Sequence, residues 1–276
     1  MGPIPSIFTL SAAAAIVAAV AFFVVQRFIK PIDMNEHQGF LDAMLSIVGT
    51  LVSILLGLLV AAALEDYQAL ETSIDNEAAS VAHVFRLTAG LPVESRKPIQ
   101  SLCVDYCDAV VKEEWPLMAK GETSKHAFVI MLKLVKQAVT FQPQTEGQNN
   151  LHAELLSSVS EIVDCRRQRI LVLHSNWTRH LMPVLLMCSV IVLAFAYLYA
   201  RRGSILHGVL ICLVAVALGG NLALVYLLRN PFSSDWAIQP RGFVLNAKIH
   251  EEIQAAPELR DLLNEEAGLK PSRLKP

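Results

Sequence analysis

The sequence predicts an all-α integral membrane protein with four transmembrane helices and a helical extramembrane domain between the second and the third. Composition supports this class, because 54% of the 276 residues are hydrophobic and only 17% are charged, with a mean hydropathy of +0.45. Four apolar runs are each long enough to cross a hydrocarbon core of about 30 Å as a helix. The polar sequence between the second and third runs keeps apolar residues at helical spacing, which predicts a bundle outside the membrane.

The four predicted spans are residues 7–28, 41–64, 181–200 and 204–228. The first differs from a signal peptide because its apolar core is too long and no basic region precedes it. The predicted domains follow directly. Residues 1–64 form the first helix pair, 65–180 the extramembrane domain, 181–228 the second helix pair, and 229–276 an irregular tail with short helices.

Within residues 65–180, the apolar pattern continues the second span beyond the membrane as one long helix, with no helix breaker before Gly90. Further helices are expected near residues 94–114, where Pro116 should help to end the helix, and near residues 124–141. Residues 142–150 predict a loop. Another helix is expected from residue 151 into the third span, and a short amphipathic helix at residues 244–255.

Charge and cysteine content exclude several functional classes. The net charge of −2 comes without a long basic run, so nucleic-acid binding is not expected. The chain has no glycine-rich phosphate loop, no His and Glu at metal-binding spacing and no nucleophile elbow, so we expect no enzyme, no cofactor and no metal. Cys103 and Cys107 lie four residues apart without a nearby histidine, which favours buried thiols over a zinc site.

Two charged motifs in residues 65–180 need an interpretation. Glu113 and Glu114 are adjacent, so a helix would direct them to different sides and they would not act as a paired acid and base. The basic cluster "CRRQR" at residues 165–169 lies close to the third span. We expect it to anchor the chain to anionic lipid head groups, and a dedicated anion site is the less favoured alternative.

The second span carries two overlapping patterns. Small residues recur at every fourth position and predict close packing against another helix. A straighter stripe of polar and small residues ends in two apolar ones, as expected of a pore-lining helix with a hydrophobic constriction. Packing and pore lining both remain open at this point. The packing row is Gly49, Ser53, Gly57 and Ala61; the stripe is Asp42, Ser46, Thr50, Ser53 and Gly57, with Val60 and Leu64 as the constriction.

The fourth span contains one intramembrane amide, Asn221. A lone amide in a span most often makes a hydrogen bond between helices, although such residues are also candidate functional sites. The bond between helices is the favoured interpretation.

Several sequence blocks together resemble the bacterial bestrophin-like domain family of unknown function, which is distantly related to bestrophin channels. The blocks lie between about residues 41 and 243, and "NEAA" and "EWPLM" are the more specific ones. They are "EDYQALETSIDNEAASVAHVFRLTAGLP", "YCDAVVKEEWPLMAKG", "RRQRI" before the third span and "NPF" after the fourth. The resemblance implies a pentameric anion channel with four spans per subunit, a cytosolic helical domain and a pore lined by the second span.

Two departures from the bestrophin pattern stand out. The constriction of bestrophins is rich in aromatic residues, whereas the stripe here offers Val60 and Leu64. The acidic calcium clasp of animal bestrophins has only Asp235 as a counterpart after the fourth span, so calcium gating is not expected.

The leading hypothesis is a homo-oligomeric ion channel, with a pentamer favoured and selectivity for anions such as chloride by analogy with bestrophins. Its expected partners are further copies of itself, the lipid bilayer and a small inorganic ion. Basic residues flank both sides of the spans, so charge alone leaves the orientation open. Free thiols in residues 65–180 favour cytosolic termini in the bacterial inner membrane. The alternative is a non-conducting oligomeric scaffold or sensor that recruits a partner through its helical domain.

Overall fold

The computed structural model describes residues 7–28, 38–173, 177–198, 205–234 and 236–255, and throughout these ranges the regular elements are helices, without a strand. The predicted all-α class is therefore confirmed. Contacts between Cα atoms divide the chain into two compact units. Unit 1 comprises Met1–Gln68 and Ser175–Ala237, and unit 2 comprises Ala69–His174 and Ile238–Pro276.

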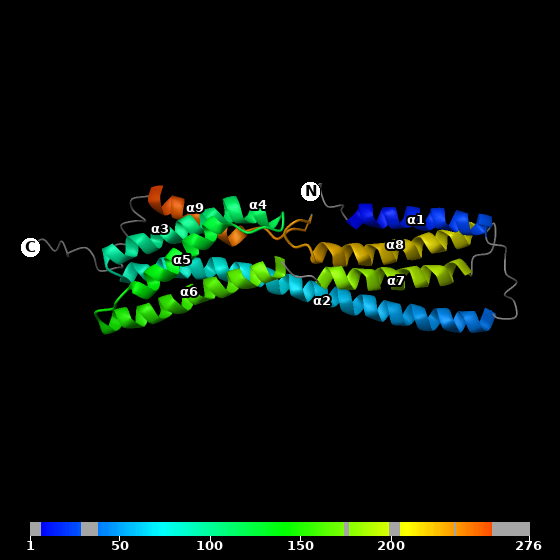
Figure 1. Cartoon of the computed structure of the whole chain (residues 1–276), viewed down its shortest axis with the longest axis horizontal. Helices are drawn as coiled ribbons and strands as arrows, with labels where there is room; N and C mark the ends of the chain where they lie inside the picture. The colour runs from blue at the N-terminus through cyan, green and yellow to red at the C-terminus, as the bar shows by residue number, and fades with distance from the viewer. Residues whose placement is uncertain (1–6, 29–37, 174–176, 199–204, 235, 256–276) are drawn as a thin grey trace, which may run out of the picture. The chain divides into compact units, whose positions relative to one another are not determined.

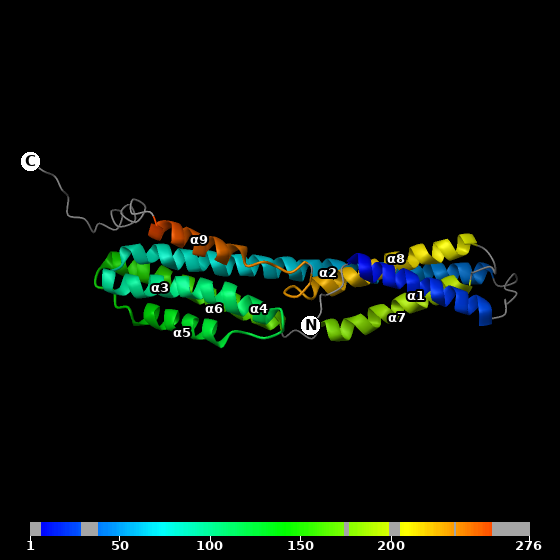
Figure 2. The same cartoon turned by 90° about the horizontal axis from the view of Figure 1, so that it is seen from above.

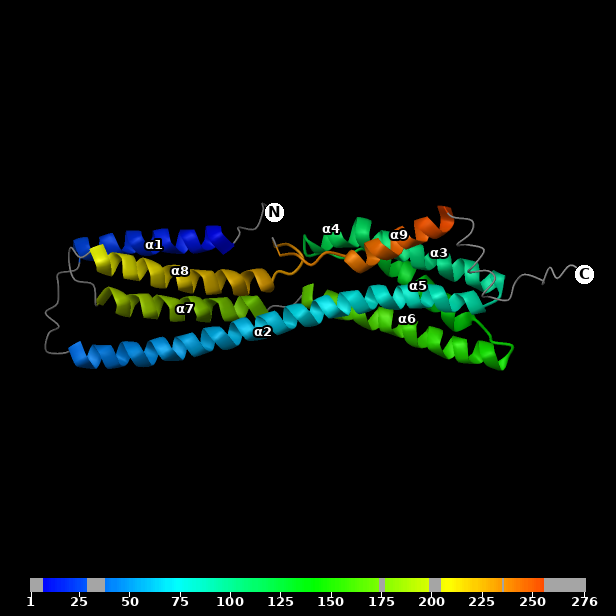
Figure 3. The ribbon, with the colours of Figure 1, turned by 180° about the vertical axis from the view of Figure 1, so that it is seen from behind.

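Unit 1 contains α1 (Ile7–Phe28), the first part of α2 (Gln38–Leu87), α7 (Trp177–Leu198) and α8 (Ile205–Leu228). Helix α8 contacts both α1 and α7 and lies between them (Figures 1 and 3). The core of this unit joins α2, α7 and α8 through buried aliphatic side chains that pack directly together. They are Val52 and Leu56 of α2, Leu185 of α7 and Val225 of α8.

Large apolar side chains cover much of the surface of unit 1. Phe8 and Ile205 are each 84% exposed, and Leu51, Leu186 and Leu213 are exposed as well. Water would penalise so large an apolar surface, whereas lipid tails would solvate it. Two segments, Ala43–Gly90 and Ile205–Leu228, are long and apolar enough to cross a membrane, and Ser11–Val24 and Met182–Tyr197 are shorter apolar helices.

Unit 2 is built from the second part of α2 and from helices that fold back along it (Figure 2). The other elements are η1 (Thr88–Gly90), α3 (Val93–Ala109), the π-helical turn η2 (Val110–Glu114), α4 (Trp115–Met118), α5 (Lys125–Thr140), α6 (Glu146–Leu173) and α9 (Arg241–Ala255). Helix α5 packs against α3 and α6, and α9 packs against α3. The chain reverses direction between α2 and α3 and again between α4 and α5. Helices α2 and α5 therefore run in the same direction.

The long second helix is confirmed, since α2 continues without a break from Gln38 to Leu87. The expected stop at Pro116 is wrong: α4 extends to Met118, and the chain turns at Gly121, whose φ is +81°. A π-helical turn ends directly before Trp115 and Pro116. Pro116 is then at the start of a new α-helical segment, where the missing N–H costs little.

Two helix starts also differ from the prediction. Helix α6 begins at Glu146 rather than at residue 151, because the Thr145 hydroxyl accepts a hydrogen bond from the backbone N–H of Gln148 at 3.2 Å and caps the helix. Helix α9 begins at Arg241 rather than at residue 244. Helix α5 begins as predicted, with Ser124 as its N-cap accepting from the N–H of Ala127 at 3.1 Å.

Candidate functional site

The stripe predicted on the second span lies on an open face of α2. Ser46, Thr50, Ser53 and Gly57 are all exposed, and Leu64 is 43% exposed. The side chain of Asp42 lies outside the described residues. The described helices of a single copy therefore leave the polar part of the stripe uncovered.

The packed face of α2 is a different one. Val52 and Leu56 are buried against α7 and α8, and on a helix with about 100° per residue they lie roughly 80–120° away from Ser46. Val60 is half-buried and packs against this same core. Of the two predicted constriction residues, Leu64 is thus the one with a largely open side chain.

Within the part of the chain that the structure describes, the row of small residues on α2 is not packed against another helix. A methyl group added at Gly49 or Gly57 would meet nothing within 4 Å outside its own helix. Ser53 and Ala61, the other members of that row, are exposed. Any close packing by this row therefore requires a second chain.

Two polar side chains in the apolar helices bond to their own backbone. The Thr50 hydroxyl donates to the Ser46 carbonyl at 2.7 Å, as threonines in apolar helices commonly do. The Asn221 amide donates to the Ala217 carbonyl of the same helix at 2.9 Å. This bond of Asn221 lies within α8, whereas the sequence favoured a bond between helices.

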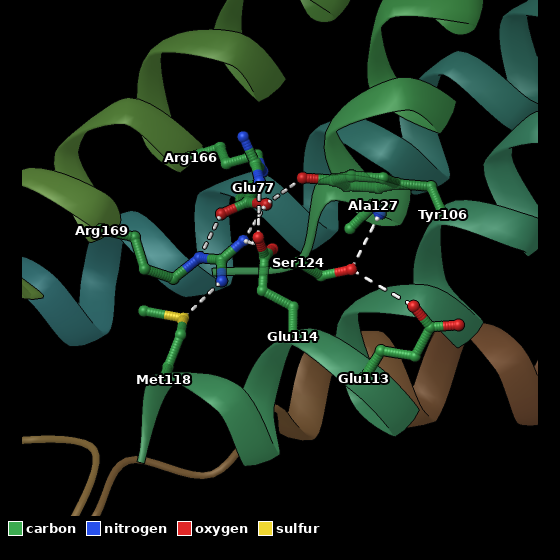
Figure 4. Close-up of polar contacts among 9 residues, drawn as sticks. All are labelled: Glu77, Tyr106, Glu113, Glu114, Met118, Ser124, Ala127, Arg166 and Arg169. Atoms are coloured by element: carbon green, nitrogen blue, oxygen red, sulfur yellow. Dashed lines mark hydrogen bonds and ion pairs between the residues drawn. The ribbon is translucent and has the colours of Figure 1, made fainter. Parts of the chain in front are cut away.

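A second polar cluster is fully buried in unit 2, and Figure 4 shows its members pointing toward one another from α2, η2 and α6. Arg169 of α6 donates from Nε and Nη2 to the Glu77 carboxylate of α2 at 2.9 and 2.8 Å. Its Nη2 also donates to Glu114 Oε2 at 3.0 Å, and Arg166 donates to the other oxygen of Glu114. Two cations and two anions thus balance in the buried interior of unit 2.

Neighbouring side chains complete this cluster of Glu77, Glu114, Arg166 and Arg169, called here the buried charge cluster. The Tyr106 hydroxyl donates to Glu77 Oε1 at 2.6 Å, and the Trp115 ring centroid lies 5.3 Å from Arg169 Cζ. Burial alone would lower the pKa of Arg169, but the charges of Glu77 and Glu114 outweigh it and raise this pKa. Arg169 therefore remains a cation whenever the protein is folded.

The buried charge cluster overturns both interpretations of "CRRQR". Arg169 is 0% exposed and Arg166 is 4% exposed, so neither can reach lipid head groups or a free anion. Only Arg167 of the three arginines is exposed. The sequence did carry a signal, because Glu77 and Arg166 each occupy an apolar position of a helical repeat. Charged residues at such positions indicate buried ion pairs, and the structure pairs Glu77 with Arg169 and Arg166 with Glu114.

Glu113 and Glu114 separate as predicted. Glu114 belongs to the buried charge cluster, whereas exposed Glu113 lies 3.0 Å from Nδ1 of His126 and accepts from the Ser124 hydroxyl at 3.2 Å. Neighbouring residues of a helix point roughly 100° apart, which suffices to place these two side chains in different environments.

Cys103 and Cys107 are free and buried, as predicted, and Cys165 is free and buried as well. Burial raises the pKa of Cys103, and it raises the pKa of Cys107 to about 12. Among the described residues, no group of three or more His, Cys, Asp or Glu side chains could hold a metal ion.

Comparisons with known proteins agree with this architecture. The family model of the bestrophin-like domain matches residues 12–243. Two variants of a bacterial bestrophin homologue from Klebsiella pneumoniae are 11% identical, with TM-scores of 0.61 and 0.63, over 88% and 91% of this chain and 96% and 98% of the homologue. The crystal structure of another membrane protein variant is 10% identical, with a TM-score of 0.60, over 88% of this chain and 94% of that one. No curated protein matches the sequence.

Proposed function

The chain belongs to the bestrophin-like family, and from this premise we propose that it forms a homo-oligomeric ion channel in a lipid bilayer, with α2 of each copy lining a central pathway. The protein is then a transporter of small inorganic ions rather than an enzyme. The similarity to bacterial bestrophin homologues in fold supports the arrangement of the helices, and the pathway is argued from this chain's own residues.

The open polar face of α2 is the observation that carries the proposal. Ser46, Thr50 and Ser53 expose hydroxyl-bearing side chains on an otherwise apolar helix. In lipid, such a face would lose its contacts with water, whereas around a central axis it would line a hydrated pathway. The face rich in Leu and Ile, including Leu51 and Leu58, would meet lipid or the neighbouring copy.

Leu64 is proposed as the narrow point of this pathway. Its side chain is 43% exposed on the line of Ser46 and Gly57, and a ring of leucines would form an apolar constriction that can gate by dewetting. Val60 would contribute less because half of its surface is already packed against α7 and α8. Gly57, one turn before Val60, would leave the pathway wide at that level. Asp42 is proposed to lie at the opposite mouth.

Selectivity for anions is proposed by analogy with bestrophins. Ser46 and Ser53 suit it, because hydroxyl hydrogens facing the pathway can donate to an anion. The hydrogen bond from Thr50 to the Ser46 carbonyl favours cations instead, since it leaves oxygen lone pairs toward the pathway. Conduction of cations is therefore the second candidate, and the sign of the reversal potential separates the two.

The proposed membrane arrangement has four spans, α1, the first part of α2, α7 and α8. Helices α1 and α7 have 22 residues each, or roughly 33 Å, which is enough to cross a hydrocarbon core. Residues 65–180 would then be a cytosolic helical domain, with both termini on the same side of the bacterial inner membrane. A pentamer is the proposed assembly. Residues 229–276 would extend from the fourth span as a tail, part of which is α9.

Recordings from purified protein in planar bilayers test the proposal. We expect conductance from the wild type and a larger conductance from Leu64→Ala, because the substitution widens the constriction. Leu58→Ala is the matched control, since Leu58 is 65% exposed on a different face of the helix and should leave conductance unchanged.

Asymmetric chloride solutions give the reversal potential and thereby the charge of the permeant ion. An intact oligomer without conductance at any salt or voltage would favour the non-conducting scaffold or sensor and would reject the channel. Equal effects of Leu64→Ala and Leu58→Ala would reject the assigned face of α2.

A further inference from the structure

Helix α5 exposes an apolar seam that the described residues leave largely open, with the Arg166 guanidinium 5.3 Å from the Phe128 ring centroid at one end. Phe128, Leu132, Val135 and Val139 recur at spacings of four, three and four residues, which is the repeat of a helix-packing seam. Phe128, Leu132 and Val139 are 44%, 47% and 63% exposed, and Val135 is half-buried. The side chains that anchor α5 to its own unit lie on a neighbouring face, with Met131, Leu134 and Ala138 buried.

The charges beside this seam are all of one sign. Helix α5 carries Lys125, Lys133 and Lys136 and no carboxylate, and all three lysines are exposed. At about 100° per residue, Lys125 and Lys136 lie roughly 50° and 70° to one side of the seam, whereas Lys133 lies roughly 130° away. The exposed part of α5 is therefore an apolar strip with a basic flank, which predicts a partner with an acidic flank.

The same unit offers such a surface on α2. Ala69, Thr72, Asn76 and Ala79 are all exposed, and they form a strip of short side chains that can receive larger ones. Glu71 and Asp75 are exposed beside it. Asp75 lies roughly 80° from the strip. Viewed down each helix axis from its N-terminus, Asp75 is displaced from the strip in the rotational sense opposite to that in which Lys136 is displaced from the seam of α5.

The two surfaces match in length and in direction. From Phe128 to Val139 the seam is roughly 16 Å long, and from Ala69 to Ala79 the strip is roughly 15 Å long, at 1.5 Å per residue. Helices α2 and α5 run in the same direction. In a parallel helix pair, flanks of opposite hand meet each other, so Lys136 would face Asp75.

The two surfaces lie on different sides of unit 2, so one copy cannot join them. Helix α5 lies at one edge of the unit, and α2 lies beyond α3 and α6 (Figure 2). The buried face of α2 turns toward α3 and α6, where Glu77 meets Tyr106 and Arg169. Two different surfaces on one chain that fit each other produce a head-to-tail contact, which closes into a ring when the rotation permits.

We propose that α5 of one copy packs on residues 69–79 of α2 in a second copy, as the contact between neighbouring subunits outside the membrane. This inference rests on the proposed oligomer and specifies which surfaces join its members. The apolar seam supplies burial at the contact, and the pairing of Lys136 with Asp75 selects the partner and its register.

Charge reversal in the full-length protein tests the contact. Native mass spectrometry in mild detergent at low salt measures the protein concentration at which half of the oligomer dissociates. We expect Lys136→Glu to raise this concentration about tenfold or more, and Asp75→Lys to do the same. Combining the two changes should recover most of the loss. Lys97→Glu, an exposed charge reversal on α3, is the control and should have no effect.

Cysteine cross-linking provides a second measurement that needs no change in stability. Leu132→Cys in one tagged copy should form a disulfide with Thr72→Cys in a differently tagged copy. Ser101→Cys, exposed on α3, replaces Thr72→Cys as the control and should give no product.

Each outcome decides one proposal. A monomeric wild type would reject both the channel and this contact. A wild-type oligomer that is indifferent to the charge reversals and gives no cross-link would reject the α5 contact alone. A third outcome is that the wild type binds anionic vesicles, with binding lost in Lys133→Glu with Lys136→Glu and oligomer stability unchanged. That outcome would assign the α5 surface to the membrane and overturn the inference.

Discussion

Replacing Arg169 by methionine would remove the cation that holds two carboxylates in the interior of unit 2. Arg169 is 0% exposed and makes hydrogen bonds to Glu77 at 2.9 and 2.8 Å and to Glu114 at 3.0 Å. Methionine has a similar length and fills the space, so the main effect is the loss of charge. Glu77 would then keep only the Tyr106 hydroxyl as a partner in the buried charge cluster.

The expected loss of stability is large for one side chain. Removing one partner of a buried ion pair typically costs about 3–5 kcal/mol, because the remaining charge stays buried without compensation. Whole domains are stabilised by only about 5–15 kcal/mol. At roughly 2–4 °C per kcal/mol for a unit of this size, the midpoint of thermal unfolding should fall by about 6–20 °C.

Thermal unfolding of the full-length protein in detergent measures this loss. Far-UV circular dichroism follows the helices, and tryptophan fluorescence includes Trp115, whose ring centroid lies 5.3 Å from Arg169 Cζ. Arg167→Met is the matched control, because Arg167 is exposed, and its effect should stay within about 0.5 kcal/mol.

A double variant separates charge from packing. In the Arg169→Met background, Glu77→Gln removes the uncompensated carboxylate, so the two changes together should cost clearly less than the sum of the separate losses. The reasoning is refuted if Arg169→Met costs less than about 1 kcal/mol, or if the two losses simply add.

Three further predictions concern unit 2. A methyl group at Gly242 would lie 2.7 Å from the Ala78 Cβ, so Gly242→Ala should destabilise the protein by about 1–3 kcal/mol in thermal unfolding. Adding Ala78→Gly should restore part of the lost stability. Gly147→Ala is the control, because a methyl group there meets nothing within 4 Å, and it should not lower stability. Removing the Ser124 cap in Ser124→Ala should cost about 1 kcal/mol in the same assay, and no loss would contradict the capping role. Burial raises the Cys107 pKa from 9.0 to about 12, so between these pH values the folded state keeps a proton that the unfolded state releases. The contribution of this thiol to the free energy of unfolding is complete below about pH 9. It is lost by up to about 1.4 kcal/mol per pH unit as the pH rises to about 12. Cys107→Ala should flatten that part of the stability curve against pH, and an unchanged slope would count against it.

The sequence predicted most helices because their signals are local. The continuous helix α2 follows from an apolar repeat without Gly or Pro, and the start of α5 follows from Ser124 before an amphipathic run. The start of α6 was missed because "QTEGQNN" looks like a loop in composition, although Thr145 and Gln148 are suitable capping residues. Pro116 was misjudged because the π-helical turn before it is not visible in residue spacing.

The site was less predictable because its residues depend on contacts between helices distant in sequence. Arg166 and Arg169 were interpreted by their closeness to a span, yet their partners Glu77 and Glu114 come from α2 and η2. The stripe on α2 has a different difficulty. In a single chain, a helix face is exposed whether it meets lipid, a water-filled pathway or a second copy in the membrane. The exposure of Thr50 is therefore compatible with all three surroundings and does not select one of them.

The π-helical turn Val110–Glu114 also bears on how sequences of this family should be aligned. Such a turn holds one residue more than the same stretch of α-helix. Deleting a single residue there should restore a regular helix and leave the segment after it nearly unrotated, because the π-helical turn absorbs the extra residue within one turn. Trp115 and Met118 would then keep their places beside Arg169. Relatives without that extra residue can therefore retain the buried arginine, and a one-residue gap at this point would mark only the presence or absence of the π-helical turn.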